Sequence, residues 1–345
     1  LFTFERSERR PIALGAVAFV MVLAFVWPRW EPKRLVIGTF RAEVTPMTFA
    51  GPDAFYAWFR SADRTLLRRD GPNTSLGITE DLTPDHPRAI IVNGKSDGHT
   101  HDDRPTVALM AHLPALFSEA SLKRVAVIGF GTGMTVGSAT LYPEVERVDV
   151  FEISETLRAH AAEFDFANGG MSKSSKVVWH IGDAYKSLLG SQEKYGFIAS
   201  EPSNPWVVGV ERLYSQEFFE LASSRIEDGG LFAQWIHTYD LSRETFAIVF
   251  KTFSSVFADV RIFRTKSGDI AILGSKRGIG PANFERARAR WQAEAVRADL
   301  DAIDVRDLSD LLAREIPIPV RYFEEAAIQT LEFPKLSYLA GHDFF

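Results

Sequence analysis

One stretch of the sequence, residues 123–154, constrains the fold more than any other. It opens with four apolar residues at 125–128, too few for a helix and rich in β-branched side chains, which predict a buried strand. A turn containing Gly129, Gly131 and Gly133 follows, and then a helical segment that ends at Pro143. A second apolar strand at 148–151 leads to Glu152. Strand, glycine turn, helix, strand and acid occur in this order in nucleoside-binding α/β units.

The residue types in this stretch indicate which ligand it would bind. Glycine accepts positive φ and lets a ligand approach the backbone, and an acid at the end of the second strand can accept two hydrogen bonds from a ribose diol. The spacing G-x-G-x-G lacks the last glycine of the dinucleotide fingerprint, and residues 134–136 offer no phosphate cradle. This favours a nucleoside without a pyrophosphate, such as an adenosyl thioether, over NAD. The alternative is a structural unit with a tight turn and no ligand.

Charge and composition exclude several classes of function. The net charge is −6 and no basic stripe stands out, so we predict no nucleic-acid partner. The chain has no cysteine, which excludes disulfides, thiolate metal sites and cysteine nucleophiles. The segment His99, His101, Asp102 and Asp103 contains suitable metal ligands, but polar loops of this kind are more often solvated. We therefore predict no metal site.

The amino-terminal region predicts a membrane anchor. Arg6, Arg9 and Arg10 precede residues 11–27, which carry no charge and reach the short limit for a membrane-spanning helix. A buried core helix and a signal peptide are the alternatives. We expect a single-pass membrane protein with the lipid bilayer as partner through residues 11–27. Basic residues on both sides leave the orientation open, and a cytoplasmic soluble domain is favoured if it uses adenosylmethionine.

The rest of the chain predicts an α/β fold. Strands alternate with helices after residue 105, which indicates a doubly wound, mainly parallel, seven-stranded Rossmann-like sheet with an antiparallel pair at its edge. We expect four segments: an anchor helix with basic flank at 1–30, a β-rich subdomain at 31–104, a nucleoside-binding domain at 105–277 and a helical extension at 278–345. The first residue is Leu1, so the chain is expected to belong to a longer or fused product, with membrane-protein partners or additional helices.

Three acids fall where such a sheet binds its ligands, beyond the carboxyl ends of the strands. Glu152 follows the second strand, Asp183 the third and Glu201 the fourth. Asp183 is placed to hold an adenine amino group, and Glu201 to act as a base or to hold a cationic amine. Each acid taken alone could equally be a helix cap or a surface charge.

Several sequence blocks resemble the spermidine synthase family, within the class I adenosylmethionine-dependent methyltransferase superfold. The blocks are Val92-Asn93-Gly94-Lys95, His112-Leu113-Pro114, the segment at 127–133 and Ser200-Glu201-Pro202-Ser203-Asn204-Pro205-Trp206. The last block resembles most closely the spermidine-synthase-like domains that are fused to multi-helix membrane segments.

The resemblance implies roles for further residues. Ala184 would join Asp183 in holding adenine, and Asp97 would lie near the sulfonium arm. Asp103 and Asn204 would face the acceptor, a small amine, and Glu201 would be the catalytic residue. The donor would be S-adenosylmethionine or decarboxylated S-adenosylmethionine.

The acceptor half departs from the family pattern. Thr132 stands where the family has an acid, and residues 106–108, Thr-Val-Ala, replace a stretch that ends in glutamate. Two hypotheses therefore stay open. The chain is a membrane-anchored aminopropyl- or methyltransferase, or it is a catalytically silent domain that serves as an interaction or structural subunit of a membrane complex.

Overall fold

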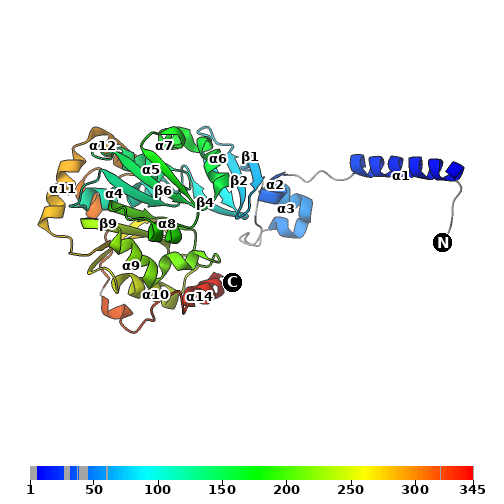
Figure 1. Ribbon diagram of the computed structural model, residues 1–345. Coiled ribbons are helices and arrows are strands. Elements are labelled where there is room, and N and C mark those ends of the chain that lie inside the picture. The colour runs from blue at the N-terminus through cyan, green and yellow to red at the C-terminus, as the bar shows by residue number, and fades with distance from the viewer. Residues whose placement is uncertain are drawn as a thin grey trace.

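A computed structural model describes residues 6–26, 32–36, 38, 46–59, 61–318 and 320–344 (Figure 1). Its main sheet contains β5 (Arg124–Ile128), β6 (Arg147–Glu152), β7 (Val177–Ile181), β8 (Tyr195–Ser200), β9 (Ile226–His237), β10 (Asp259–Lys266) and β11 (Asp269–Ser275). In space these strands follow the order β10-β11-β9-β8-β5-β6-β7. The order reverses beside β5, and this is where open α/β sheets bind ligands.

Strand direction in the main sheet is mixed. The five strands from β7 to β9 run parallel, whereas β11 runs antiparallel to both β9 and β10. The predicted Rossmann-like sheet of the methyltransferase type, with seven strands and an antiparallel pair, is confirmed. Because β11 is reversed, its first residue, Asp269, lies opposite His237 at the carboxyl end of β9. The edge hairpin therefore brings its own side chains to the ligand-binding edge.

Helices cover both faces of the main sheet (Figure 1). One face carries α4 (Arg104–Phe117), α5 (Met134–Thr140), α11 (Pro281–Trp291) and α12 (Glu294–Asp301); the other carries α8 (Ala184–Gly190), α9 (Gln216–Ser224), α10 (Arg243–Ser254) and α14 (Lys335–Phe344). In β5, Val125 and Val127 pack into the first layer, and Ala126 and Ile128 into the second. Successive strand residues point to opposite faces, so burial on both sides explains the continuous apolar run.

A smaller sheet precedes the main one. It contains β1 (Asp63–Asp70), β2 (Ser75–Asp81), β3 (Arg88–Val92) and β4 (Lys95–His99), all antiparallel and in sequence order. The sequence predicts a polar loop from Gly94 to Arg104, and its first half is instead β4. Asn93 and Gly94 take φ of 50° and 84°. Two consecutive positive φ values suit a tight hairpin turn, which folds the polar segment back onto β3.

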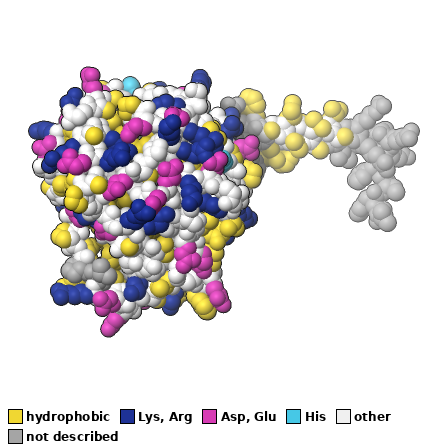
Figure 2. All heavy atoms as spheres, turned by 60° about the vertical axis from the view of Figure 1, so that its left-hand side comes forward, with side chains coloured by type: hydrophobic (Ala, Val, Ile, Leu, Met, Phe, Trp, Pro, Cys, Tyr) yellow, Lys and Arg dark blue, Asp and Glu magenta, His cyan; other side chains and the backbone are white. Residues whose placement is uncertain are grey.

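Short elements complete the described chain. They are α2 (Pro32–Val36), η2 (Pro46–Ala50), α3 (Pro52–Phe59), α6 (Glu155–His160), η3 (Ala161–Phe164), α7 (Asp165–Asn168), η4 (Met171–Lys173), η5 (Val210–Tyr214), α13 (Leu308–Leu312) and η6 (Val320–Phe323). The face seen in Figure 2 carries Lys and Arg side chains interspersed with Asp and Glu. The division into four segments and the absence of a nucleic-acid partner stay predictions.

The predicted membrane anchor is wrong. Its residues 6–26 form the helix α1 (Arg6–Val26), and residues 1–5 and 27–30 lie outside the described ranges. Among the helices of those ranges, none has the length and apolar character that crossing a bilayer requires. The uncharged part of α1, from Pro11 to Val26, would extend about 24 Å at 1.5 Å per residue, short of a hydrocarbon core of about 30 Å. The lipid bilayer as partner and the membrane localisation are corrected with it.

Candidate functional site

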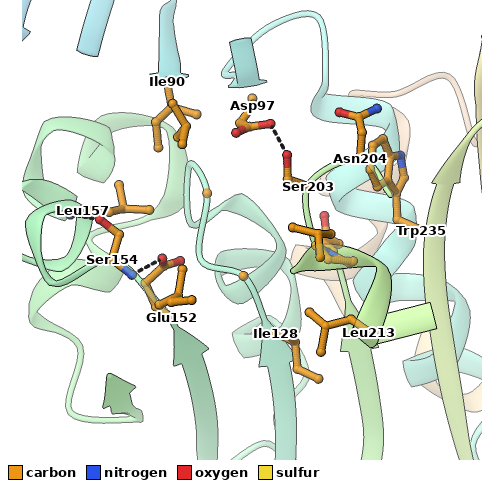
Figure 3. A pocket seen from close by; sticks show the side chains of 18 of the residues that line it. Ile90, Asp97, Ile128, Glu152, Ser154, Leu157, Ser203, Asn204, Leu213 and Trp235 are labelled. Atoms are coloured by element: carbon orange, nitrogen blue, oxygen red, sulfur yellow. Dashed lines mark hydrogen bonds between the residues drawn. The ribbon is translucent and has the colours of Figure 1, made fainter. Parts of the chain in front are cut away.

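A cavity of about 660 Å³ opens between the small sheet and the carboxyl ends of the parallel strands (Figure 3). Ile90 of β3 lines one wall, and Ile128 at the end of β5 lines another. The cavity brings together all of the predicted site residues except Gly133, namely Asp97, Asp103, Gly129, Gly131, Glu152, Asp183, Ala184, Glu201 and Asn204. Residues far apart in the sequence therefore meet around one space, as the strand pattern predicts.

The glycine turn forms the wall between β5 and α5. Gly129 has φ of 86°, and a Cβ there would lie 2.5 Å from the backbone oxygen of Glu201. Gly131 has φ of 53°, and nothing lies within 4 Å of the position that its Cβ would take. Gly133 precedes α5 and packs against Phe130. It therefore belongs to the turn without lining the cavity. The turn thus presents backbone, without side chains, to the cavity.

Glu152 ends β6 and is held by two backbone amides. Its Oε2 accepts a hydrogen bond from the amide of Phe130 at 3.0 Å, and its Oε1 accepts one from Ser154 at 2.8 Å (Figure 3). The residue is 6% exposed, and burial raises the pKa of the carboxyl although both amides oppose the shift. A carboxylate oxygen has about two acceptor sites, so each oxygen keeps one for a ribose hydroxyl.

Asp183 and Ala184 lie one strand further along the same edge. The Asp183 carboxyl caps α8, because its Oδ1 accepts a hydrogen bond from the amide of Lys186 at 3.1 Å. Its Oδ2 lies 3.5 Å from the guanidinium of Arg212. The cap and the cavity lining are both present, so the helix-cap interpretation and the adenine interpretation do not exclude each other.

Glu201 follows β8 and lines the cavity. Burial raises the pKa of its carboxyl to about 8; the hydroxyl of Thr135 opposes the shift and the charge of Asp103 adds to it. Its buried Oε1 has no hydrogen-bond partner among the described residues. A buried acceptor without a partner costs free energy, which disfavours the charged form of this carboxyl.

Asp97 and Asn204 share one buried cation, Lys95. The Lys95 ammonium forms an ion pair with Asp97 and donates a hydrogen bond to Asn204 Oδ1 at 2.7 Å. Asp97 Oδ1 also accepts a hydrogen bond from the hydroxyl of Ser203 at 2.9 Å (Figure 3). Lys95 is only 6% exposed. The charge that Asp97 would offer to a sulfonium arm is therefore largely balanced from within the protein.

Asp103 is paired in the same way, with a lysine from the edge hairpin. Lys266 forms an ion pair with Asp103, and its Nζ lies 3.5 Å from Asp269 Oδ2. That Asp269 oxygen also accepts a hydrogen bond from the hydroxyl of Thr106 at 3.1 Å. Burial raises the pKa of Asp269, against the effect of the nearby ammonium. Asp269, Lys266 and Asp103 all line the cavity.

The chain matches a described family and several characterised relatives. Residues 106–266 match the family described as Spermine/spermidine synthase domain. This region belongs to the spermidine synthase family. The chain is 26% identical to polyamine aminopropyltransferase 2 of Hyperthermus butylicus over 68% of this chain and 78% of the relative. It is 30% identical to spermine synthase of Arabidopsis thaliana, over 49% of this chain and 50% of the relative.

Two solved structures share the fold of this chain. A spermidine synthase from Thermotoga maritima has a TM-score of 0.60 at 18% identity, covering 75% of this chain and 86% of that chain. A spermidine synthase in complex with the transition state analogue AdoDATO has a TM-score of 0.59 with the same coverage and identity. The chain spans about half the length of some curated relatives, such as the aminopropyltransferase of Sulfolobus acidocaldarius, of which it covers 58%. The resemblance to the membrane-fused subgroup stays a prediction.

The polar side chains of residues 99–103 form hydrogen bonds within the protein. His99 Nε2 lies 3.2 Å from Asp81 Oδ2, and His99 Nδ1 accepts a hydrogen bond from the amide of Asp102 at 3.0 Å. His101 Nδ1 lies 3.0 Å from Asp102 Oδ1. Both ring nitrogens of His99 are therefore engaged, and no group of three or more His, Cys, Asp or Glu placed for a metal ion occurs in the described residues.

Sequence reasoning missed three residues of the cavity, Lys95, Lys266 and Asp269. The signal for Lys95 is Asn93-Gly94, which predicts a hairpin turn and so a strand that points alternate residues at the cavity. The sequence gives no comparable signal for Lys266 and Asp269. They reach the cavity only because β11 pairs antiparallel with β9.

Proposed function

We propose that the cavity binds an adenosyl thioether and transfers its aminopropyl group to an amine. The donor is decarboxylated S-adenosylmethionine, as the names of the aminopropyltransferase relatives imply. One observation carries the proposal: Gly131, Glu152 and Asp183 line one part of a single cavity and Glu201 lines another. The side-chain-free turn and the two available lone pairs of Glu152 fit the sugar of a nucleoside.

The residues of the chain contribute position and proton removal to this transfer. The acceptor nitrogen forms a bond to the carbon next to sulfur, the carbon–sulfur bond breaks, and its electron pair stays on the sulfur of methylthioadenosine. The acceptor nitrogen also loses a proton, and we assign its removal to the carboxylate of Glu201, which lines the cavity. Aligning nitrogen, carbon and sulfur accounts for most of the rate enhancement in such a displacement.

Titration with methylthioadenosine, followed by calorimetry, tests the nucleoside half. Wild-type protein is expected to bind, and Glu152→Gln to bind about tenfold to a hundredfold more weakly, because hydrogen bonds to a charged acceptor become weaker neutral ones. Glu155→Gln is the matched control, since Glu155 is exposed at the start of α6 and does not line the cavity. A flat titration of the wild type, or equal losses in both variants, contradicts the proposal.

A turnover assay distinguishes the transferase from the alternative, a catalytically silent domain. Methylthioadenosine binding without product from any amine would support that alternative, whereas an amine panel supplied with decarboxylated S-adenosylmethionine is expected to yield product. The silent alternative and the transferase share the nucleoside site, so binding of methylthioadenosine does not distinguish them.

A further inference from the structure

We propose that the acceptor end of the cavity takes an amine with a single positive charge, and that Lys266 sets this limit. This proposal rests on the proposed function, because it names the class of acceptor for the same site. The Lys266 side chain is itself an alkylammonium. It sits between Asp103 and Asp269, where the second ammonium of a diamine would otherwise bind.

Strand order separates this end from the nucleoside end. Glu152 ends β6 and Asp183 follows β7, on one side of β5. Glu201 follows β8 and Asp269 begins β11, on the other side. Lys266 ends β10, and its ammonium also lies 3.5 Å from the backbone oxygen of Asp102. An alkylammonium held by two carboxylates and a carbonyl has the contacts that a diamine terminus requires. The protein already provides this cation.

A second lysine of the protein, Lys95, also neutralises a carboxylate of the cavity. Lys95 pairs with Asp97 and is held by Asn204, so another cavity carboxylate is compensated by the protein. Glu201 is largely protonated at neutral pH, since burial raises its pKa to about 8. Asp269 lies within 3.5 Å of Lys266, yet its buried Oδ1 has no hydrogen-bond partner among the described residues. Among the described acids of this end, Glu201 forms no ion pair with a lysine, so this end has room for one ammonium, bound at Glu201.

The walls beside these acids suit an alkyl chain. Trp235 near the end of β9 lines the cavity together with Val107 of α4 and Tyr239. A second charged end would have to lie against these aromatic and apolar surfaces or displace Lys266 from its ion pair. Burying an unpaired ammonium is unfavourable, so a diamine binds worse than a monoamine of the same length.

The test compares amines matched in length. Butylamine and 1,4-diaminobutane, and pentylamine and 1,5-diaminopentane, are titrated into wild-type protein with and without methylthioadenosine. The expected result is at least about tenfold tighter binding of each monoamine. Equal or tighter binding of the diamines overturns the proposal, and so does the absence of binding by all four amines. The affinities of the four amines are also compared in the absence of methylthioadenosine. This comparison therefore does not depend on whether methylthioadenosine binds.

Lys266→Met supplies the decisive variant. It keeps a long unbranched side chain but removes the ammonium, so Asp103 and Asp269 become available to a second positive charge. The diamine is expected to gain at least about tenfold relative to the monoamine. An unchanged ranking in a folded Lys266→Met protein overturns the proposal.

Two further variants show that the effect is local. Lys123→Met removes an exposed lysine paired with Glu146, which does not line the cavity, and is expected to leave the ranking unchanged. The double variant Asp103→Asn with Lys266→Met leaves fewer unpaired charges, which guards against loss of folding. It is expected to return the diamine preference toward that of the wild type, and a full diamine gain in the double variant would contradict the role of Asp103.

Discussion

The two ends of the cavity use acidic residues in opposite ways. At the nucleoside end, Glu152 is positioned by the backbone amides of Phe130 and Ser154, which leave its charge uncompensated. At the acceptor end, Asp97 and Asp103 each form an ion pair with a lysine. Amides orient a carboxylate and leave it able to bind, whereas an ammonium cancels its charge. Under the proposed function, the same residue type would recognise a ligand at one end and limit the ligand's charge at the other.

Glu201 belongs to the acceptor end, and replacing it is expected to have the largest effect. Glu201→Gln removes the group that accepts a proton, and should lower the turnover rate by about 10²–10⁴-fold. Because burial raises the pKa of Glu201 to about 8, the carboxylate forms only as pH rises toward and beyond that value. The wild-type rate should therefore increase between pH 7 and pH 9 and then level off, as measured with decarboxylated S-adenosylmethionine over that range.

Stability measurements on the same variant provide the control. The folded-state pKa of Glu201 lies above the ordinary glutamate value of 4.5, so the folded protein holds this proton more tightly than the unfolded chain. Its contribution to the free energy of unfolding falls as pH rises from 4.5 to about 8, by up to about 1.4 kcal/mol per pH unit. Glu201→Gln should abolish this part of the decline. A wild-type rate without a rise near pH 8, together with an unchanged stability profile, would contradict the assignment.

The nucleoside end was predictable because its signals are local in sequence. A buried strand, three glycines and an acid lie within residues 125–152, and backbone sterics connect each residue type to its place. The parallel order of the strands then brings Asp183 and Glu201 to the same edge. Their chemical roles stay predictions, but their shared cavity follows from strand direction alone.

The acceptor end was not predictable in the same way. Lys266 and Asp269 are ordinary hairpin residues in the sequence, and only the pairing of Asp269 with His237 brings them to the cavity. Local patterns carry no information about which distant strand supplies a counter-charge. The error at α1 has another origin: an uncharged run predicts burial in lipid only if it is long enough, and residues 11–26 are too few.

Gly131→Ala tests whether the glycine turn presents its backbone to a ligand. Alanine at φ of 53° costs about 1–2 kcal/mol of stability, and its methyl group would enter the open space beside the cavity. Methylthioadenosine binding should weaken by about tenfold, as measured by calorimetry. Gly170→Ala is a matched control, because Gly170 has φ of 79°, equally open space and no place in the cavity wall. The two variants are expected to lose similar stability, but only Gly131→Ala should lose affinity for methylthioadenosine. Equal losses of affinity in both variants would assign Gly131 a purely structural role.

Asp183→Asn is expected to have the smallest effect, and it separates the helix cap from the ligand contact. Asparagine caps a helix about as well as aspartate, so the melting temperature should hardly change while the oxygen that accepts from Lys186 is retained. The new amide group would donate, not accept, toward the base. Methylthioadenosine should therefore bind about fivefold more weakly, whereas methylthioinosine, which has a carbonyl in place of the amino group, should lose nothing. Asp307→Asn at the start of α13 is the matched cap outside the cavity and should alter neither titration. Equal losses for both nucleosides would mean that Asp183 supports the site only through α8, and Glu152 would then be the acid of this end that meets the ligand.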